Sequence, residues 1–464
     1  MIRQCPPRWQ GGRMSMKPRG LRLALTIAAA CVGFTSSSSA ESLKSVVEKT
    51  LTSNPEIGAL IANRLAIDQE LEAAKGLGRP TLDVRGSAGY VWTDQQKGTS
   101  PTGFEDDTAE YNISAVASMP IFDGWKTSYE VENNANRVDS ARHRVADTAN
   151  SLGLQAIQVY LEVQRAGAVL EIAERNVRVH RTYLSRVNTR IAGGAAAEAE
   201  GLQARSRLAD SEAALIEARS RLTDAWSAYI AVVGEQPGSL SPAGRPGHMP
   251  KSAGEAVEIA LQFAPSLIAL HHDAEAARAA IGSAESEFYP KLNLEVSADH
   301  KGDQDKDFTD ESNFKALVVG KLNIYNGGID TARVREARFR ASQAEQTALN
   351  ARRQIEKEVR LSWLAIMSAN ARAQVLRHQL EQNKALVAAY LKQFDLGQRS
   401  LMDILDVQNE IFTTETTIAS ENFSGTFNSY RVLAAMGRLL DALNLPLPDE
   451  ATREPDRYRR IAIP

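Results

Sequence analysis

Four segments of the chain alternate apolar and polar residues with a period of two, the pattern of β-strands with two different faces. In the first segment the apolar residues of one parity are Leu82, Val84, Ala88, Tyr90 and Trp92. The four predicted strands span residues 81–94, 110–121, 291–300 and 313–325. A hairpin packed on a soluble core would explain any one segment alone. Four together, each of about ten to thirteen residues, favour tilted transmembrane strands.

Aromatic residues gather at both ends of these predicted strands. Those near the intervening loops are Tyr90, Trp92, Tyr111 and Phe314. Those near the flanking helical segments are Phe122, Tyr289 and Tyr325. Because aromatic side chains concentrate at the two interfaces of a membrane, we expect these residues to form two girdles in contact with lipid.

The number of predicted strands has a consequence for assembly. The smallest membrane barrels have about eight strands, so one chain cannot close a barrel. An open sheet would leave unpaired backbone groups in lipid, and each such group costs several kcal/mol. We therefore expect several copies of the chain to share one barrel.

Two long segments, 123–191 and 328–394, contain no proline and almost no turn signal. As helices they would each be on the order of 100 Å long. The first carries a heptad series at Val163, Leu170, Val177, Leu184 and Ile191, which is coiled-coil spacing. Shorter helices are predicted at 197–233 and 400–443. The residues expected to form the turns between the paired helices are Gly193, Gly194 and Gly397.

The chain is an internal duplication. Pro55 and Pro80 in the first half correspond to Pro265 and Pro290 in the second, both 210 residues apart. Gly194 and Gly397 are 203 residues apart, and the change of offset fits a longer loop in the first half. We therefore predict a first repeat over 41–233, a linker over 234–251 and a second repeat over 252–445. The tail, 446–464, is expected to be poorly ordered.

The N-terminus resembles an export leader, and composition limits the remaining possibilities. A cationic start, an apolar run and small residues ending at Ala40 predict a cleaved signal peptide over 1–40, with lipidation at Cys31 as the alternative. Both cysteines, Cys5 and Cys31, lie in this leader, so we expect no disulfide in the exported chain. No later segment is long and apolar enough for a spanning helix, so any membrane insertion must use strands. The net charge of -3 argues against nucleic acid as a partner.

Asp403 and Asp406 lie three residues apart in the segment FDLGQRSLMDILDVQNE. Ser400 and Asp403 form a capping-box-like arrangement at a helix start, which accounts for Asp403. Asp406 lies beyond the first turn and is either a solvated surface residue or a functional one. Catalysis would need a third group and a pocket, and no HExxH, GxSxG or P-loop motif is present. We expect no enzyme activity, no metal and no cofactor.

With these features the chain resembles the TolC family of outer-membrane efflux and secretion channels. The resemblance covers about residues 42–445 and is carried by the duplicated halves, the PIFDG and NIYNGG junctions, and FDLGQRSLMDILDVQNE. It implies a mainly α fold with a membrane β-barrel: a homotrimer in which twelve strands form one barrel and long helices form a periplasmic tunnel. The implied location is the outer membrane of a Gram-negative bacterium.

The resemblance also implies roles for residues at the periplasmic entrance. Asp403 and Asp406 match the entrance aspartates, which threefold symmetry would arrange as rings, and Arg399 matches an arginine that helps to hold the entrance shut. Glu200 is a candidate carboxylate partner for Arg399. Phe394 stands where a family member has tyrosine, so it lacks the hydroxyl for a hydrogen-bonded latch.

The implied partners are a periplasmic adaptor and an inner-membrane ABC or proton-driven transporter. The motifs lean toward type I polypeptide secretion, while drug or metal efflux stays open. The alternative from another class is a periplasmic or surface structural coiled-coil protein.

Overall fold

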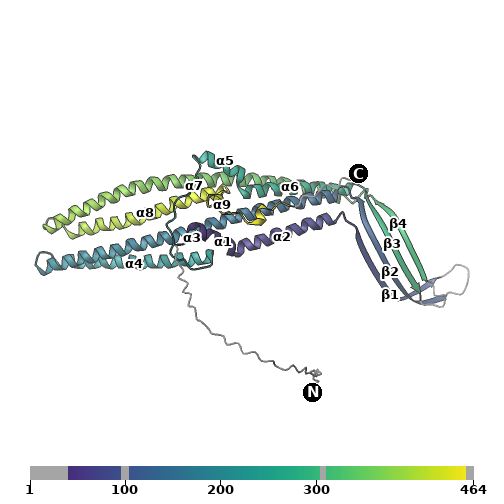
Figure 1. Ribbon diagram of the computed structural model, residues 1–464, viewed down its shortest axis with the longest axis horizontal. Helices are drawn as coiled ribbons and strands as arrows, with labels where there is room; N and C mark the ends of the chain where they lie inside the picture. The colour runs from purple at the N-terminus through teal and green to yellow at the C-terminus, as the bar shows by residue number, and fades with distance from the viewer. Residues whose placement is uncertain (1–39, 96–103, 304–309, 456–464) are drawn as a thin grey trace, which may run out of the picture. The chain divides into compact units, whose positions relative to one another are not determined.

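The structure is a computed structural model that describes residues 40–95, 104–303 and 310–455. The first repeat contains α1 (Leu43–Ser53), α2 (Pro55–Gly76), β1 (Thr81–Gln95), β2 (Phe104–Phe122), α3 (Lys126–Ala192) and α4 (Glu198–Val233). The second contains α5 (Ala253–Phe263), α6 (Pro265–Glu285), the short helix η1 (Ser286–Phe288), β3 (Lys291–Asp303), β4 (Asp310–Lys321), α7 (Ile329–Asp395) and α8 (Leu401–Ala435). Two short helices follow, α9 (Leu439–Ala442) and α10 (Asp449–Thr452) (Figure 1).

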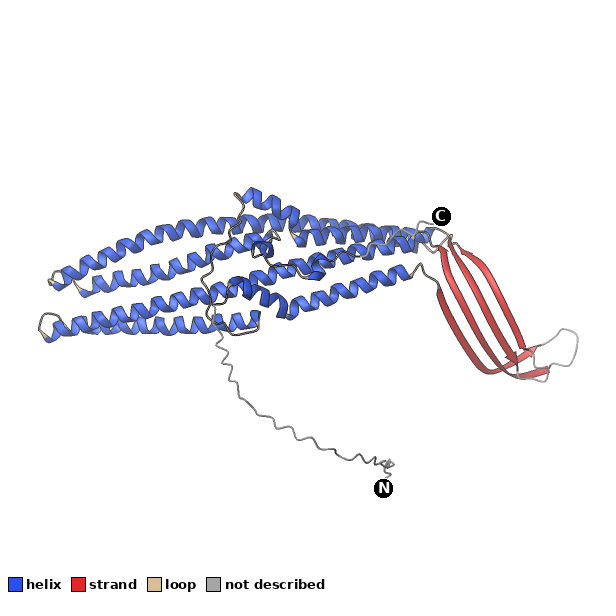
Figure 2. Cartoon of the chain, in the orientation of Figure 1, coloured by secondary structure: helices blue, strands red, loops and turns tan. Residues whose placement is uncertain are grey.

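The strands form one antiparallel sheet in the order β1-β2-β3-β4 (Figure 2). The register aligns the apolar residues across the sheet, for example Val84 with Ala115, Ala298 and Phe314. The next row is polar and joins Arg85, Ser114, Asp299 and Asn313. The fold class is confirmed as mainly helical with four antiparallel strands. Within the described residues, β1 and β4 each have one unpaired edge.

The largest differences from the sequence pattern are at three element boundaries. β2 starts at Phe104 rather than near 110, because Glu105 pairs with Asp94 through the backbone without apolar alternation. β4 ends at Lys321, so Tyr325 lies beyond the strand. α8 stops at Ala435 rather than 443. Gly437 adopts a left-handed φ of 69° there, and a Cβ on it would lie 2.7 Å from the Phe263 carbonyl oxygen.

The long helices pair into two hairpins, α3 with α4 and α7 with α8. α3 also packs against α2, α6 and α8, whereas α7 packs against α6, α8 and α5 in the described part of the chain. Across the helical part, α3 therefore lies between α2 and α4 on one side and α6 and α8 on the other. α7 lies beyond α6 and α8. α3 has neighbours on both sides, while α7 and the α2–α4 layer have free sides, as do β4 and β1 in the sheet.

The main hydrophobic core lies where α1, α3, α4, α5, α8 and α9 meet, with Ile57 of α2 and Val359 of α7 added to it. Tyr160, Leu152 and Ile157 of α3 are its largest fully buried members on that helix. The residues after Pro446, expected to be poorly ordered, include α10 and pack on α3 as far as they are described. Ala451 of α10 is buried against Val145 and Ala146, an apolar contact too small to register in a sequence dominated by proline and charge.

Among the described residues, no single helix is both long enough and apolar enough to cross a membrane; the bent pair α5 and α6 meets the criterion of length and composition only when taken together.

Candidate functional site: the helix tips and the sheet ends

Each hairpin tip is closed by the same kind of glycine turn. At the end of α3, the Gly194 N–H donates to the Ile191 carbonyl oxygen at 3.0 Å and the Ala195 N–H donates to that of Arg190 at 2.8 Å. At the end of α7, Gly397 donates to Phe394 and Gln398 to Gln393, both at 2.9 Å. Both glycines have φ of 73°, the left-handed conformation of a Schellman cap. Gly193 precedes the first cap with φ of -86°, so only Gly194 and Gly397 need that freedom.

The two tips share an apolar cluster to which all four long helices contribute. Phe394 of α7 is 2% exposed and lies with Val187 of α3, Ala204 of α4 and Ile404 of α8. Phe394 is therefore a packing residue in this chain. Burying a side chain of this size stabilises by about 1.5–3 kcal/mol, so the cluster dominates the energy that holds the tips together.

Arg190, which the sequence analysis did not select, connects the two tips. Its guanidinium donates to the Phe394 carbonyl oxygen, donates from Nη2 to the Ala195 carbonyl oxygen at 3.1 Å, and lies 4.3 Å from the centre of the Phe394 ring. The Phe394 carbonyl belongs to the last turn of α7, where a cation is favoured by the helix dipole, and the Ala195 carbonyl belongs to the turn that follows α3. One arginine thus caps both turns. The sequence did contain a signal for this role, because Arg190 is a basic residue in the last helical turn before the glycine cap.

Asp406 pairs with a residue that the sequence analysis also missed. Arg207 of α4 donates from Nη2 to Asp406 Oδ1 at 2.8 Å, joining the first hairpin to the second. Asp406 is therefore more than a solvated surface residue in this chain. An exposed pair of this kind contributes about 0–1 kcal/mol, less than the apolar cluster beneath it. Its partner could not be found by spacing, because the two residues are 199 positions apart.

Arg399 pairs with Asp403 and does not reach Glu200. The Arg399 Nη1 lies 3.4 Å from Asp403 Oδ2, and the guanidinium lies 4.1 Å from the centre of the Tyr390 ring. Within the described residues of one chain, Arg399 pairs with Asp403 and Glu200 forms no ion pair with it. The physical reason is proximity, since Arg399 directly precedes the N-cap residue Ser400 and Asp403 lies in the first turn of α8. Asp403 also donates its backbone N–H to Ser400 Oγ at 3.4 Å, the expected cap.

Further along the hairpins, Glu415 of α8 is held by two cations. Arg175 of α3 approaches its carboxylate at 3.2 Å and Lys384 of α7 at 2.8 Å. Burial alone would raise the pKa of Glu415, but the hydrogen bonds from Lys384 and Arg175 outweigh it and leave the pKa lowered. Arg190, Arg207 and Arg175 therefore all lie on the first hairpin and contact acceptors on the second.

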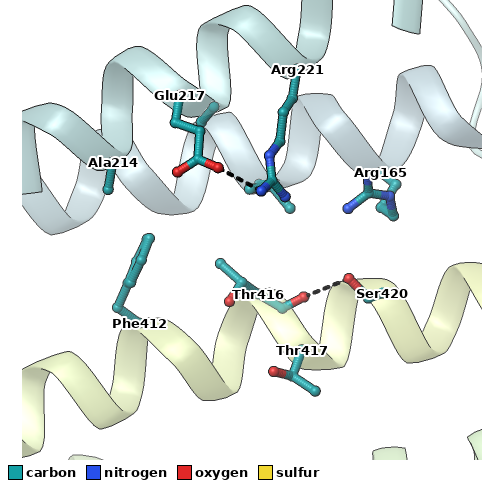
Figure 3. A pocket seen from close by; sticks show the side chains of 10 residues that line it. Arg165, Ala214, Glu217, Arg221, Phe412, Thr416, Thr417 and Ser420 are labelled. Carbon is teal, nitrogen blue, oxygen red and sulfur yellow. Dashed lines mark hydrogen bonds and ion pairs between the residues drawn. The ribbon is translucent and has the colours of Figure 1, made fainter. Parts of the chain in front are cut away.

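A cavity of about 320 Å³ separates α3 and α4 from α8 near these contacts (Figure 3). Phe412 and Thr416 of α8 face Arg221 and Glu217 of α4 across it. Arg221 pairs with Glu217 of its own helix at 2.5 Å rather than with α8. The hairpins are therefore loosely packed here, between the tips and the core. No group of three or more potential metal ligands occurs in the part of the chain that the structure describes.

The predicted interface aromatics fall into three environments. Tyr90, Phe314 and Tyr325 are exposed, with 85%, 75% and 82% of their surface accessible. Tyr111 lies across β3, with its hydroxyl 3.4 Å from His300 Nε2 and its ring over Gly302, where no Cβ would fit. Trp92 belongs to β1, but its side chain lies outside the described part.

In the third environment, Phe122 and Tyr289 both pack on Trp125. Trp125 was not predicted, because it lies outside the alternating strand pattern. Trp125 stacks edge-on with Phe122 at 5.0 Å and with Tyr289 at 5.3 Å between ring centres. It has a left-handed φ of 65° and immediately precedes α3. The cluster therefore fixes the junction where strand becomes helix.

An antiparallel sheet open at both edges, continued by two long helical hairpins with polar closures at their tips, defines one subunit of an oligomeric export channel. The chain belongs to the outer membrane efflux protein family, which it matches over residues 46–235 and 256–438. It is thus an outer-membrane channel for secretion or efflux, with a β-barrel and a helical tunnel, and not an enzyme. Channels of this family are trimers.

Individual relatives agree with this assignment over most of their length. The chain is 22% identical over 400 residues to the outer membrane efflux protein BepC of Brucella suis, covering 86% of each chain. It is 23% identical over 457 residues to the outer membrane protein TolC of Escherichia coli K12, covering 94% of this chain and 90% of the relative. The solved CmeC outer membrane channel of Campylobacter jejuni superposes with a TM-score of 0.76 at 16% identity, covering 86% of each chain.

Proposed function

We propose that this protein is the passive exit duct of a tripartite export system, closed at its helix tips until its partners bind. The partners would be a periplasmic adaptor and an inner-membrane transporter of the ABC or proton-driven type. The observation that carries the proposal is the Arg207–Asp406 pair, which joins the two hairpins beside the capped turns. An exposed ion pair adds little stability beside the apolar cluster, which supplies most of the free energy that holds the hairpins together. Its position between the two hairpins therefore supports a role in opening and closing them.

The trimer would close through the free sides of each subunit. The open edge of β4 would pair with β1 of the next copy, so three sheets of four strands would give a closed barrel of twelve. The free side of α7 would meet α2 and α4 of the same neighbour. Such a head-to-tail contact generates a ring when the rotation closes.

Threefold symmetry would repeat the entrance residues around the axis. Asp403 and Asp406 would form rings whose negative charge is partly offset by Arg399 and Arg207 from the same chain. Opening would separate the hairpins, break the Arg207 and Arg190 contacts, and expose carboxylates that favour cations. The loosely packed cavity beside Phe412 would accommodate this movement.

The domain assignment follows the same scheme. Residues 1–40 would be the leader, 41–233 and 252–445 the two repeats, and 234–251 the linker between them. The seven selected aromatic residues would lie at the two membrane interfaces in contact with outer-membrane lipid, with Trp125 added to the inner girdle.

The cargo would be a polypeptide of a type I secretion system or a small molecule. A relative 20% identical over 384 residues, AprF of Pseudomonas aeruginosa, is named for alkaline protease secretion, while BepC is named for efflux. Membership of the channel family argues against the alternative of a structural stalk.

Conductance across a planar lipid bilayer tests the closed-tip proposal. The wild-type trimer should conduct weakly, and the double variant Arg190→Ala with Arg207→Ala should conduct several-fold more. The matched control is Arg181→Ala, which removes an arginine of α3 that pairs with Glu212 of α4 and so stays within the first hairpin. Equal conductance in the wild type and the double variant would overturn the gating role of these arginines.

A further inference from the structure

The helices of the two repeats correspond position by position along the chain. The bounds of α1 and α5 are 210 residues apart at both ends, and those of α3 and α7 are 203 residues apart at both ends. α2 and α6 begin 210 residues apart, at Pro55 and Pro265. A groove between helices of one repeat can therefore be compared with the same positions in the other.

In the first repeat, the groove between α2 and α3 is filled by the C-terminal segment 446–455, which we call the strap. Ala451 of the strap is buried against Val145 of α3. Arg64 of α2, which is 1% exposed, donates from Nη2 to the Arg453 carbonyl oxygen at 3.0 Å. The strap therefore closes this groove with a small apolar side chain and a backbone hydrogen bond.

The same positions of the second repeat surround a cavity of about 420 Å³ between α5, α6 and α7. All three helices contribute to its apolar lining, which consists of Leu261, Leu267, Ala274, Ala348 and Leu349. Ala274 and Ala348 occupy the positions of Arg64 and Val145. Because both alanines are smaller, the second groove keeps space that side chains fill in the first.

The charged residues that line the cavity balance one another. Arg278 of α6 lies 2.6 Å from Glu345 of α7 and 2.5 Å from Glu275 of its own helix. Arg352 of α7 is the fourth charged member of the lining. Two arginines and two glutamates leave no net charge, so shape and apolar surface would select what binds here.

The proposed trimer would leave this cavity accessible. Within one chain, α3 packs on α6 and α8, and its groove toward α2 is still open to the strap. α2 and α4 of the next copy, placed against α7 in the same way, would leave the groove between α6 and α7 open for the same reason. Leu349, which stands at the position of Ala146, forms a wall of this groove that is 50% exposed in one chain.

We propose that the groove between α6 and α7 binds a short peptide segment of another periplasmic protein, with a leucine or phenylalanine side chain in the cavity. The strap is the template, because it is a short segment bounded by prolines that occupies the corresponding groove of the first repeat. The anchor is larger than Ala451 because Ala274 and Ala348 leave more room. Arg352 would donate to a backbone carbonyl oxygen of the segment, as Arg64 does to the strap.

This groove is remote from the helix tips, so the inference goes beyond the proposed gate. Leu349 lies 46 residues before Asp395, the last residue of α7. At 1.5 Å per residue this separation is about 69 Å. A partner bound here would hold the outside of the helical wall without touching Arg190 or Arg207, and its binding can fail while the gate works, or the reverse.

Fluorescence anisotropy with labelled peptides tests the inference on the purified trimer. The probe is the strap sequence PLPDEATREP carrying the change Ala451→Leu, and the comparison peptide is the unchanged sequence. The leucine peptide should bind at least about tenfold more tightly, because its three additional carbons enter the cavity. Equal affinities of the two peptides, or no binding of the leucine peptide, would overturn the proposal.

Two variants of the protein test whether the peptide binds in this groove. Leu349→Glu places a carboxylate on the exposed wall of the cavity and should weaken binding of the leucine peptide at least about tenfold. The matched control, Asn350→Glu, adds the same charge at a neighbouring exposed position that does not line the cavity, and should bind as the wild type does. Unchanged binding in Leu349→Glu would refute the assignment of the site.

A variant that ends at Pro455 tests whether the same chain supplies the occupant. The wild type and this shortened variant should bind the leucine peptide equally. Binding by the shortened variant alone would show that residues 456–464 fill the groove, which would overturn the proposal of a separate partner.

Discussion

α3 and α7 occupy equivalent places in the two repeats but have different surroundings. Each is 67 residues long and ends in a glycine cap of the same geometry. α3 is flanked on both sides and buries Tyr160, Leu152 and Ile157 completely. α7 has neighbours on one side only in the described chain, and its large apolar residues Leu364, Met367 and Val375 are 62%, 58% and 69% exposed.

This difference shows that a single chain leaves the outer sides of α7 and α4 without neighbours among the described residues. α4, at the opposite free side, likewise exposes Leu202, Ile216 and Trp226. Apolar side chains in rows on two opposite sides of a subunit are a hydrophobic surface of the kind that marks an interface. α3 therefore acquires its whole environment when the chain folds, whereas the free side of α7 would be covered only in the proposed trimer; its other side already buries Val359 and Phe394 within one chain.

The largest effect should come from charging the free side of α7. The double variant Leu364→Asp with Met367→Asp would place two carboxylates in the expected interface, where burial of an unpaired charge is strongly disfavoured. We expect the trimer to be lost while the helical content of the chain is kept. Light scattering of the detergent-extracted protein measures the mass, and Leu364→Met should leave it trimeric. A trimer formed by the charged variant would show that this side of α7 stays exposed.

Truncating a core residue of α3 should lower the free energy of unfolding of the chain itself. Leu152 is 1% exposed in the main core, and Leu→Ala at such a site typically costs about 2–5 kcal/mol. Thermal unfolding followed by circular dichroism would show the loss. The matched variant on α7, Leu364→Ala, should alter trimer dissociation far more than unfolding of the chain. Similar unfolding of the two variants would remove the contrast between α3 and α7.

Acid should weaken the contact between α3 and α6. Burial, then the positive charge of Arg142 and of His272, lowers the pKa of His143 to about 4. Since the unfolded chain has the ordinary value near 6.5, it binds the proton more readily. Stability is therefore complete above pH 6.5 and falls as the pH drops toward 4, by about 1–2 kcal/mol after allowance for partial solvent screening. Melting curves across this range should become less pH-dependent in His143→Gln; an unchanged dependence would exclude His143 as the cause.

The smallest stability effect is expected at the tips. Arg207→Ala removes one exposed pair and should change the free energy of unfolding by about 0–1 kcal/mol. Its effect on conductance should be larger, because the gate needs only a small free-energy difference between two arrangements of the hairpins. A fall in melting temperature as large as that of Leu152→Ala would mean that Arg207 supports the fold rather than the gate.

The fold was predictable from the sequence because the spacing of apolar residues differs between its strands and its helices. Alternation at Val84 and Phe314 and the heptads around Val177 set the strand and helix types, and the glycines at 194 and 397 set the turns. The short helix α10 was not predictable, since its stability comes from burying Ala451 against a helix some 300 positions earlier in the chain.

The tip site was predictable only in part. The motif around Asp403 indicated its cap, because the partner Ser400 is local. Arg207 and Arg190 could not be found in this way, because each gains its role from a residue in the other repeat. The contact between Glu200 and Arg399 stays a prediction for neighbouring subunits, because Arg399 pairs with Asp403 within one chain.

The accessibility of a single cysteine on α7 tests the central claim most directly, because residues 41–464 contain no cysteine. Leu364→Cys should resist a maleimide reagent in the native trimer and react after denaturation, while Gln236→Cys, on the exposed linker, should react in both states. Rapid labelling of Leu364→Cys in an intact trimer would contradict the account, since it would show that no neighbouring chain covers α7.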